Sequence, residues 1–212
     1  ALPGQTLAQA EDDVRTAISF APPHVSHYQL TIEPNTYFHA HRPEVPDDES
    51  AWPMQARCTE LLAAAGLGEY EISARALPGR ECRHNLNYWQ YGDFLGLGAG
   101  AHGKLTHADG SVERYWKTRL PRDYLDASKA FLAGSKRLAA SELPFDFLMN
   151  ALRLVDGVPS CLYSQRTGQP LDALAGTLDQ AKARGLLEPW HQSLKPTERG
   201  RLFLNDLLEM FL

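Results

Sequence analysis

The pattern of apolar positions predicts alternating helices and strands along the first third of the chain. Apolar residues at helical spacing cover positions 6–20 and 50–65, and β-branched and aromatic residues at 24–33 and 70–73 are typical of strands. Thr6 is expected to be the N-cap of the first helix, because T-x-x-Q forms a capping box. The order helix, strand, helix, strand predicts an α/β barrel or an open parallel sheet.

Pro53 decides where the second helix is expected to begin. Proline breaks a helix in its interior but fits the first turn, so Ser50 is predicted as the N-cap. Cys58 and Leu62 then fall on the buried face. Gly66 follows as the C-terminal stop.

Short apolar runs and turn residues organise the rest of the chain. A buried strand or turn is expected over residues 94–102, and Asp109-Gly110 predicts the turn of a hairpin. A change of composition at residues 135–141 separates two predicted domains, 1–134 and 135–212. The second domain, helices with a short hairpin, resembles a winged helix. Beyond residue 120, helices are predicted over 121–132, 144–155, 171–184 and 197–211, and the hairpin over 186–196.

Length, charge and cysteine spacing exclude several classes of protein. With 212 residues and a net charge of −5, the chain is large enough for a sizeable core and has no overall attraction for nucleic acid or anionic membranes. No apolar run approaches the roughly 20 residues of a membrane helix. The three cysteines, Cys58, Cys82 and Cys161, are widely spaced, which favours a reducing, cytoplasmic location. They form no CxxC or CxxxCxxC spacing, so no zinc or iron–sulfur cage is expected.

The HNLNYW segment carries the most varied candidate chemistry. The imidazole of His84 can ligate a haem iron, and Tyr88 and Trp89 offer flat apolar contacts. Cys82 is a rival thiolate ligand. In the alternative interpretation, His84 and Asn85 cap a turn and the aromatic rings belong to the core.

The glycine run after this segment does not predict a dinucleotide site. Gly96, Gly98 and Ala101 match G-x-G-x-x-A, but Gly103 and a hairpin follow where a helix would have to begin. The glycines instead permit close approach of a ligand or of another strand.

Two further features allow more than one interpretation. Glu69 and Glu71 are predicted to share a strand face, either as an acid–base pair or as solvated edge charges. The winged-helix resemblance suggests nucleic-acid binding, but the helix at 171–184 balances acidic and basic residues instead of presenting a basic face. Docking of a partner, or covering an active-site opening, fits this helix better.

Eight segments follow one another in a recognisable order. They are LPGQT at 2–6, SHYQLTIEPNT at 26–36, EYEISARALPG at 69–79, HNLNYW at 84–89, FLGLGAGAH at 94–102, ALRLVDGV at 151–158, GLLE at 185–188 and LKPTERGRLFLN at 194–205. Together they resemble the HemW family, radical-SAM proteins related to oxygen-independent coproporphyrinogen III oxidases. The resemblance covers nearly the whole chain. It implies a mixed α/β fold, the C-terminal part of a partial (β/α)6 barrel followed by a small, winged-helix-like helical domain.

The resemblance also implies two binding sites. In the family, HNxxYW is associated with haem, and His84 is the implied iron ligand. The residues implied for haem are His84, Asn85, Tyr88 and Trp89. The residues implied for S-adenosylmethionine are Leu30, Thr31, Ala101 and His102.

The function implied by the resemblance is that of a haem chaperone, which binds haem or porphyrin and passes it to haem-accepting proteins. Family members also use S-adenosylmethionine and a [4Fe–4S] cluster held by CxxxCxxC. Because that motif is absent, the chain is expected to be the C-terminal half of such a protein, without catalytic residues of its own. Exposed strand edges are then expected, through which two copies could pair.

Two alternatives to the chaperone remain. One is an oxygen-independent coproporphyrinogen III oxidase, which decarboxylates propionates through a 5′-deoxyadenosyl radical. The other is a winged-helix nucleic-acid binder, which the acidic balance of the chain opposes.

Overall fold

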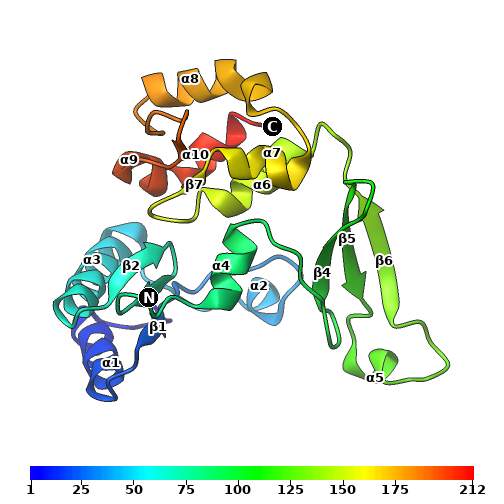
Figure 1. Cartoon of the computed structure of the whole chain (residues 1–212). Coiled ribbons are helices and arrows are strands. Elements are labelled where there is room, and N and C mark those ends of the chain that lie inside the picture. Colours follow the sequence, from blue (N-terminus) through cyan, green and yellow to red (C-terminus); the bar gives the residue numbers. More distant parts are fainter. The chain divides into compact units, whose positions relative to one another are not determined.

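A computed structural model describes all 212 residues, which form two compact units, Ala1–Cys82 and Arg83–Leu212 (Figure 1). The domain boundary predicted between residues 134 and 135 falls within strand β6 (Leu132–Arg137). That boundary stays a prediction, and the two compact units divide the chain between Cys82 and Arg83. No helix has both the length and the apolar character needed to cross a membrane.

The first unit packs two helices beside a small antiparallel sheet of strand order β1-β3-β2. Its core lies where Ala10 and Val14 of α1 meet Met54, Cys58 and Leu62 of α3. The elements are α1 (Leu7–Ser19), β1 (His24–Ser26), α2 (Tyr37–Ala40), α3 (Asp48–Ala64), β2 (Gly68–Glu71) and β3 (Ala74–Ala76).

The predicted capping box at the start of α1 is confirmed. Thr6 N–H donates to Gln9 Oε1 at 2.9 Å, and Gln9 N–H donates to Thr6 Oγ1 at 3.3 Å. Two amide groups that lack helical partners are thereby satisfied.

The predicted start of α3 was wrong. Asp47, not Ser50, is the N-cap, and its Oδ1 accepts from Ser50 N–H at 2.9 Å. Pro53 therefore lies in the second turn, where it forfeits a single hydrogen bond. The Asp47 cap and two acidic residues in the first turn favour the earlier start. Gly66 ends the helix region with φ +83°, as predicted.

The strand predictions of the first unit needed two corrections. The strand expected over 24–33 ends at Ser26, because its partner β3 is short and only His27 N–H continues the pairing, to Ser73 O at 2.9 Å. The expected parallel order is also wrong. A tight turn after β2 returns the chain directly as β3, and such a short connection allows only antiparallel neighbours.

The two glutamates of β2 do not form the predicted pair. The register shifts between Glu69 and Glu71, which interrupts the alternation of faces. Glu69 is exposed and forms an ion pair with Arg75 at 3.2 Å, whereas Glu71 is 1% exposed. Their surroundings therefore differ.

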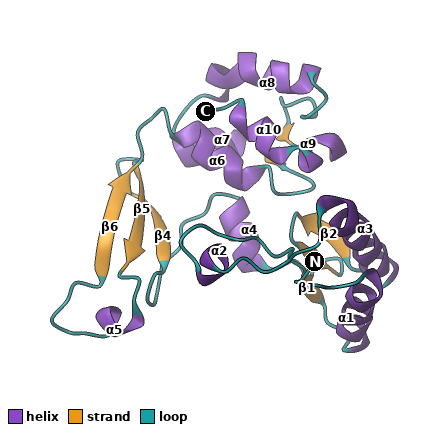
Figure 2. Ribbon diagram, turned by 180° about the vertical axis from the view of Figure 1, so that it is seen from behind, coloured by secondary structure: helices purple, strands orange, loops and turns teal.

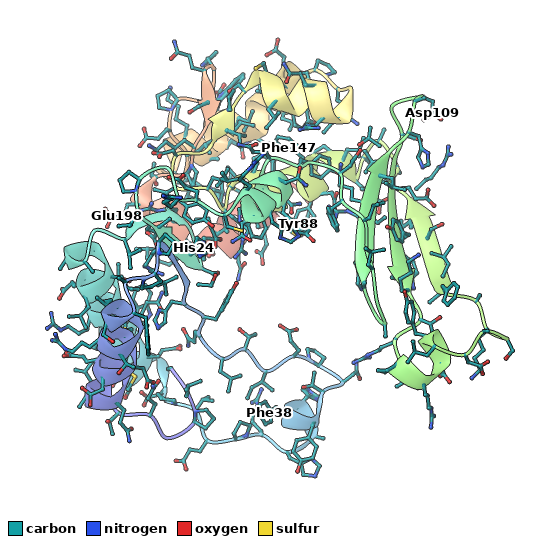
Figure 3. The ribbon with its side chains drawn as sticks, turned by 60° about the horizontal axis from the view of Figure 1, so that its bottom comes forward. His24, Phe38, Tyr88, Asp109, Phe147 and Glu198 are labelled. Carbon is teal, nitrogen blue, oxygen red and sulfur yellow. The ribbon has the colours of Figure 1, made fainter.

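The second unit contains a three-stranded antiparallel sheet of order β4-β5-β6 and a group of helices around the short β7–β8 pair (Figure 2). The hairpin turn predicted at Asp109-Gly110 is confirmed, and Asp109 marks its tip in Figure 3. The elements are α4 (Arg83–Trp89), β4 (His102–Thr106), β5 (Val112–Lys117), α5 (Pro121–Tyr124), β6 (Leu132–Arg137), α6 (Leu143–Ala151), β7 (Val158–Pro159), α7 (Cys161–Thr167), the 3-10 helix η1 (Leu171–Leu174), α8 (Ala175–Ala183), β8 (Ser193–Leu194), α9 (Glu198–Leu202) and α10 (Leu204–Glu209).

The helix predicted over 121–132 was wrong beyond its first turn. After α5, Asp126 Oδ1 accepts from Ser128 N–H at 3.0 Å and forms a local turn. The following residues join β5 as strand β6. Gly134 lies across from Trp116, whose ring would be 2.5 Å from an added Cβ.

The remaining C-terminal predictions are largely confirmed. Helix α6 lies within a residue of its predicted start, and η1 with α8 covers 171–183 before Gly185 at φ +69°. The predicted hairpin at 186–196 contributes a bridge between Leu187 and Pro196. The last helix is divided at Phe203, whose φ and ψ of −112° and 45° are not helical.

His27 makes the stability of the first unit depend on pH. Its Nδ1 is buried without a hydrogen-bond partner, and burial, followed by the charge of Arg75, lowers the pKa of this imidazole. The pKa in the folded state is thus below the unfolded value of about 6.5. The unfolded chain binds more protons in this window, so stability present above about pH 6.5 is lost as the pH falls.

We therefore expect protection of the α1 and α3 amides against hydrogen exchange to fall as the pH drops below about 7.5. A His27→Gln variant should show a smaller fall. The exposed His39 supplies the control, and His39→Gln should behave as the wild type. An unchanged pH dependence in His27→Gln would show that another group is responsible.

Candidate functional site

Helix α4 carries the HNLNYW segment and presents its histidine to solvent. His84 is exposed near the start of the helix, and its ring meets the edge of Tyr88 one turn later, with centroids 4.6 Å apart at 81°. The ring nitrogens of His84 make no hydrogen bond. No residue of α4 is fully buried, and Tyr88 and Trp89 are half-buried, which disfavours the alternative interpretation of these rings as core residues.

Two further contacts extend the aromatic surface of α4. Tyr88, labelled in Figure 3, packs against Phe94 with ring centroids 4.2 Å apart. The guanidinium carbon of Arg153 lies 4.5 Å from the centre of the Trp89 ring, within the range of a cation–π interaction. Phe94 was missed as part of the site, although it directly precedes the glycine run.

The C-terminal end of α4 turns sharply and is tied to the next segment. Tyr91 adopts the left-handed region at φ +57°, and Gly92 N–H donates to Asn87 O at 2.7 Å. A Cβ at Gly92 would lie 2.0 Å from the Asn87 side chain, so this turn requires glycine. Asn87 Nδ2 then donates to Asp93 O at 2.9 Å.

A buried lysine follows this turn. Lys104 is 1% exposed, and its Nζ donates to Asp93 Oδ1 at 2.8 Å, Tyr91 O at 3.1 Å and Thr106 Oγ1 at 3.3 Å. Burial lowers the pKa of Lys104, and Asp93 opposes that change. For Asp93, burial acts to raise the pKa, but hydrogen bonds from Lys104 and Thr106 outweigh it and lower the pKa.

A second polar group joins Tyr91 to α6 and β5. Tyr91 O–H donates to Asp146 Oδ2 at 2.5 Å, and Arg114 Nη2 donates to the same oxygen at 2.8 Å. Burial and then the bond to Asp146 raise the pKa of Tyr91, so its hydroxyl stays a neutral donor. Sequence reasoning missed both polar groups.

The glycine run is used for packing within the chain. Gly96 N–H donates to Tyr115 Oη at 2.8 Å, and a Cβ at Gly96 would lie 2.4 Å from the carbonyl of His102. At this glycine, the close approach is to another strand. The run was expected to be buried, but Leu95 and Leu97 are 69% and 83% exposed, because the loop points their side chains outward.

The residues implied for S-adenosylmethionine are divided between the units. Leu30 and Thr31 belong to the first unit, and Ala101 and His102 to the second, so the structure places each pair only within its own unit. The His102 ring stacks near Trp116, with centroids 6.5 Å apart and planes 30° apart.

The donor groups of the chain suit haem better than an iron–sulfur cluster. No group of three or more His, Cys, Asp or Glu side chains can hold a metal ion, and the cysteines are dispersed, with Cys58 buried and Cys161 exposed. A [4Fe–4S] cluster needs several thiolates together. A haem iron can be held by one imidazole, which exposed His84 can supply.

Comparisons with known proteins identify a family. Residues 138–203 match the family described as the HemN C-terminal domain. The chain is 46% identical over 211 residues to the heme chaperone HemW of Escherichia coli and 44% identical to that of Haemophilus influenzae, with 100% of this chain and 55% of each relative covered. The resemblance to the HemW family is confirmed.

A comparison of structures gives a further match. The structure of Escherichia coli coproporphyrinogen III oxidase (HemN), described as a radical SAM enzyme, matches with a TM-score of 0.73 at 14% identity, covering 99% of this chain and 52% of that one. The predicted mixed α/β fold, matching the C-terminal part of the radical-SAM fold, is thereby confirmed, although the chain forms small sheets and no closed barrel. The chain spans about half the length of the curated relatives it matches.

Proposed function

We propose that this chain is the haem-binding part of a haem chaperone, with α4 as the haem site. The observation that supports this proposal is that the His84 imidazole is exposed, has no hydrogen-bond partner and contacts the edge of the Tyr88 ring. A haem iron needs a free ring nitrogen, and its macrocycle needs flat apolar contacts, which Tyr88 and Trp89 supply. Asn85, half-buried beside them, belongs to the same proposed site. The names of the HemW relatives support haem as the cargo.

Haem titration of the chain tests this proposal. The Soret band should saturate near one equivalent of haem, and His84→Ala should weaken binding at least about tenfold. The matched control is His191, another exposed imidazole of the same unit, which stacks on Trp190 with centroids 4.2 Å apart. His191→Ala should leave the titration unchanged.

Two results would contradict the proposal. Equal affinity in His84→Ala would move the ligand elsewhere, and Cys82→Ser would then test the rival thiolate. Absence of any saturable Soret change in the wild-type chain would remove the haem site from this part of the protein.

The proposal has further parts that concern a longer protein. Transfer of haem to acceptor proteins in the cytoplasm is proposed from the relatives' names and from the dispersed cysteines. S-adenosylmethionine, contacted by Leu30, Thr31, Ala101 and His102, and a [4Fe–4S] cluster are proposed only for the longer form. Pairing of two copies through strand edges, such as those of β1 and β2, is proposed as well.

Coproporphyrinogen III oxidase activity is the second candidate, favoured by the fold match to HemN. We infer that the chain by itself does not perform that reaction, because its donor groups do not fit the cluster. Conversion of coproporphyrinogen III by the longer, cluster-loaded protein would favour the enzyme.

A further inference from the structure

Several contacts that hold α4 in place lie at its C-terminal end. The helix spans only Arg83–Trp89, and an isolated helix shorter than roughly 12 residues is unstable in water. Tertiary contacts must therefore set its direction. The polar anchor nearest to its end is the group Tyr91, Asp93, Lys104 and Thr106, called here the Lys104 clasp.

Every donor of the Lys104 ammonium is used in this clasp. Its three N–H groups face Asp93 Oδ1, Tyr91 O and Thr106 Oγ1 at 2.8, 3.1 and 3.3 Å. Asp93 also accepts from Thr106 N–H at 3.0 Å and from Thr106 Oγ1 at 2.8 Å. The bond between Lys104 and Thr106 lies within strand β4, and the other four bonds join that strand to Tyr91 and Asp93 of the segment after α4, so the clasp fixes the segment to the strand.

The clasp is connected to the helix itself by two routes. The carbonyl of Tyr91, which Lys104 binds, lies two residues beyond the last residue of α4. Asn87, inside the helix, donates to the backbone carbonyl of Asp93 at 2.9 Å. Apolar residues in place of a buried ion pair often stabilise a fold just as well. We therefore look for the role of Lys104 and Asp93 in the geometry that they impose and not in the stability that they add.

We propose that the Lys104 clasp positions the haem site by fixing the direction of α4. This inference rests on the proposed haem binding by His84. A helix of this length extends about 10 Å, so a tilt of about 10° at the clasped end moves His84 by about 2 Å. Lys104 is thus a positioning residue that acts through His84, without touching haem.

The first test measures amide hydrogen exchange of the whole chain without haem. In Lys104→Met, the amides of Gln90, Tyr91 and Gly92 should exchange at least about tenfold faster, because their bonds to Leu86, Tyr88 and Asn87 lose their support. The matched control is Lys136→Met on strand β6 of the same sheet. Lys136 is 56% exposed and forms a surface ion pair with Glu142, so its removal should leave these amides unchanged.

The second test is a double-mutant cycle on haem affinity. Lys104→Met should weaken haem binding about tenfold while the Soret maximum at saturation stays in place, because the same imidazole still ligates the iron. In a His84→Ala background, Lys104→Met should cause no further loss. Lys136→Met should change neither measurement.

The outcomes separate this inference from the proposed function. Wild-type exchange and affinity in Lys104→Met, with haem binding intact, would overturn the clasp alone. An equal loss of affinity with and without His84 would also overturn it, because the clasp would then act by another route. Failure of the wild type to bind haem would contradict the proposed function and, with it, the positioning role of Lys104.

A milder variant covers the case in which Lys104→Met does not fold. Thr106→Val removes one acceptor of Lys104 and one donor to Asp93 but keeps their ion pair. The same three amides should exchange faster by a smaller factor. Unchanged exchange in Thr106→Val would then overturn the inference.

Discussion

Gly200→Ala is expected to destabilise the second unit by about 3 kcal/mol or more, because the added methyl group has no space. A Cβ at Gly200 would lie 1.8 Å from the carbonyl oxygen of Leu186. The obstacle is backbone and cannot rotate away. Thr197, whose N–H donates to that same carbonyl at 3.1 Å, holds the start of α9 against it. The methyl group must therefore push α9 from the segment that it covers.

Gly176→Ala provides the matched control within the same unit. Gly176 is also helical, but an added Cβ meets nothing within 4 Å and its φ is not positive. Alanine is the better helix former, so this variant should match the wild type or gain up to about 1 kcal/mol. Urea unfolding followed by tryptophan fluorescence measures both variants. Equal stabilities for the two would show that α9 can move from Leu186 at little cost.

Local signals in the sequence located the helix ends well. The capping box at Thr6 and the glycine stop at Gly66 each depend on a few neighbouring residues, so the local sequence specifies them. The start of α3 was missed because Ser50 was chosen as the N-cap so that Pro53 would fall in the first turn. The side chain of Asp47 made the earlier start more favourable.

Predictions failed where distant parts of the chain decide the structure. A helix was predicted to end at residue 132 and a domain boundary to follow at 135–141, yet the backbone of residues 132–137 pairs with β5. The parallel order failed for a local reason, since the tight turn after Glu71 pairs β2 directly with β3. In both cases the pairing partner of a strand decides its place, and periodicity does not reveal that partner.

The candidate site shows the same division. The residues of HNLNYW were identified from a contiguous motif, and they do lie on one helix. The partners that hold this helix could not be inferred, because they are far apart in sequence. Tyr91 and its acceptor Asp146 are 55 positions apart, and Lys104 reads as an ordinary strand residue. Burial of a lysine becomes visible only in three dimensions.

Phe147→Ala is expected to cost the second unit about 3–5 kcal/mol, since Phe147 is 0% exposed and its removal leaves a cavity. Its ring meets Tyr91 and Tyr163 with centroids 5.3 Å apart in each case, and Figure 3 labels it on α6. Both edge contacts are lost together with the buried area. Phe203, which is 51% exposed, supplies the control, and Phe203→Ala should change stability by no more than about 0.5 kcal/mol.

The contact with Tyr91 gives Phe147→Ala a second expected consequence. Tyr91 lies at the clasped end of α4, so a cavity beneath its ring should loosen the helix before the unit unfolds. Under conditions where the variant is still folded, haem affinity should therefore fall, whereas Phe203→Ala should bind haem as the wild type does. If Phe147→Ala loses stability but keeps full haem affinity, the direction of α4 is set by the polar contacts of Lys104 and Asp146 and not by packing on α6.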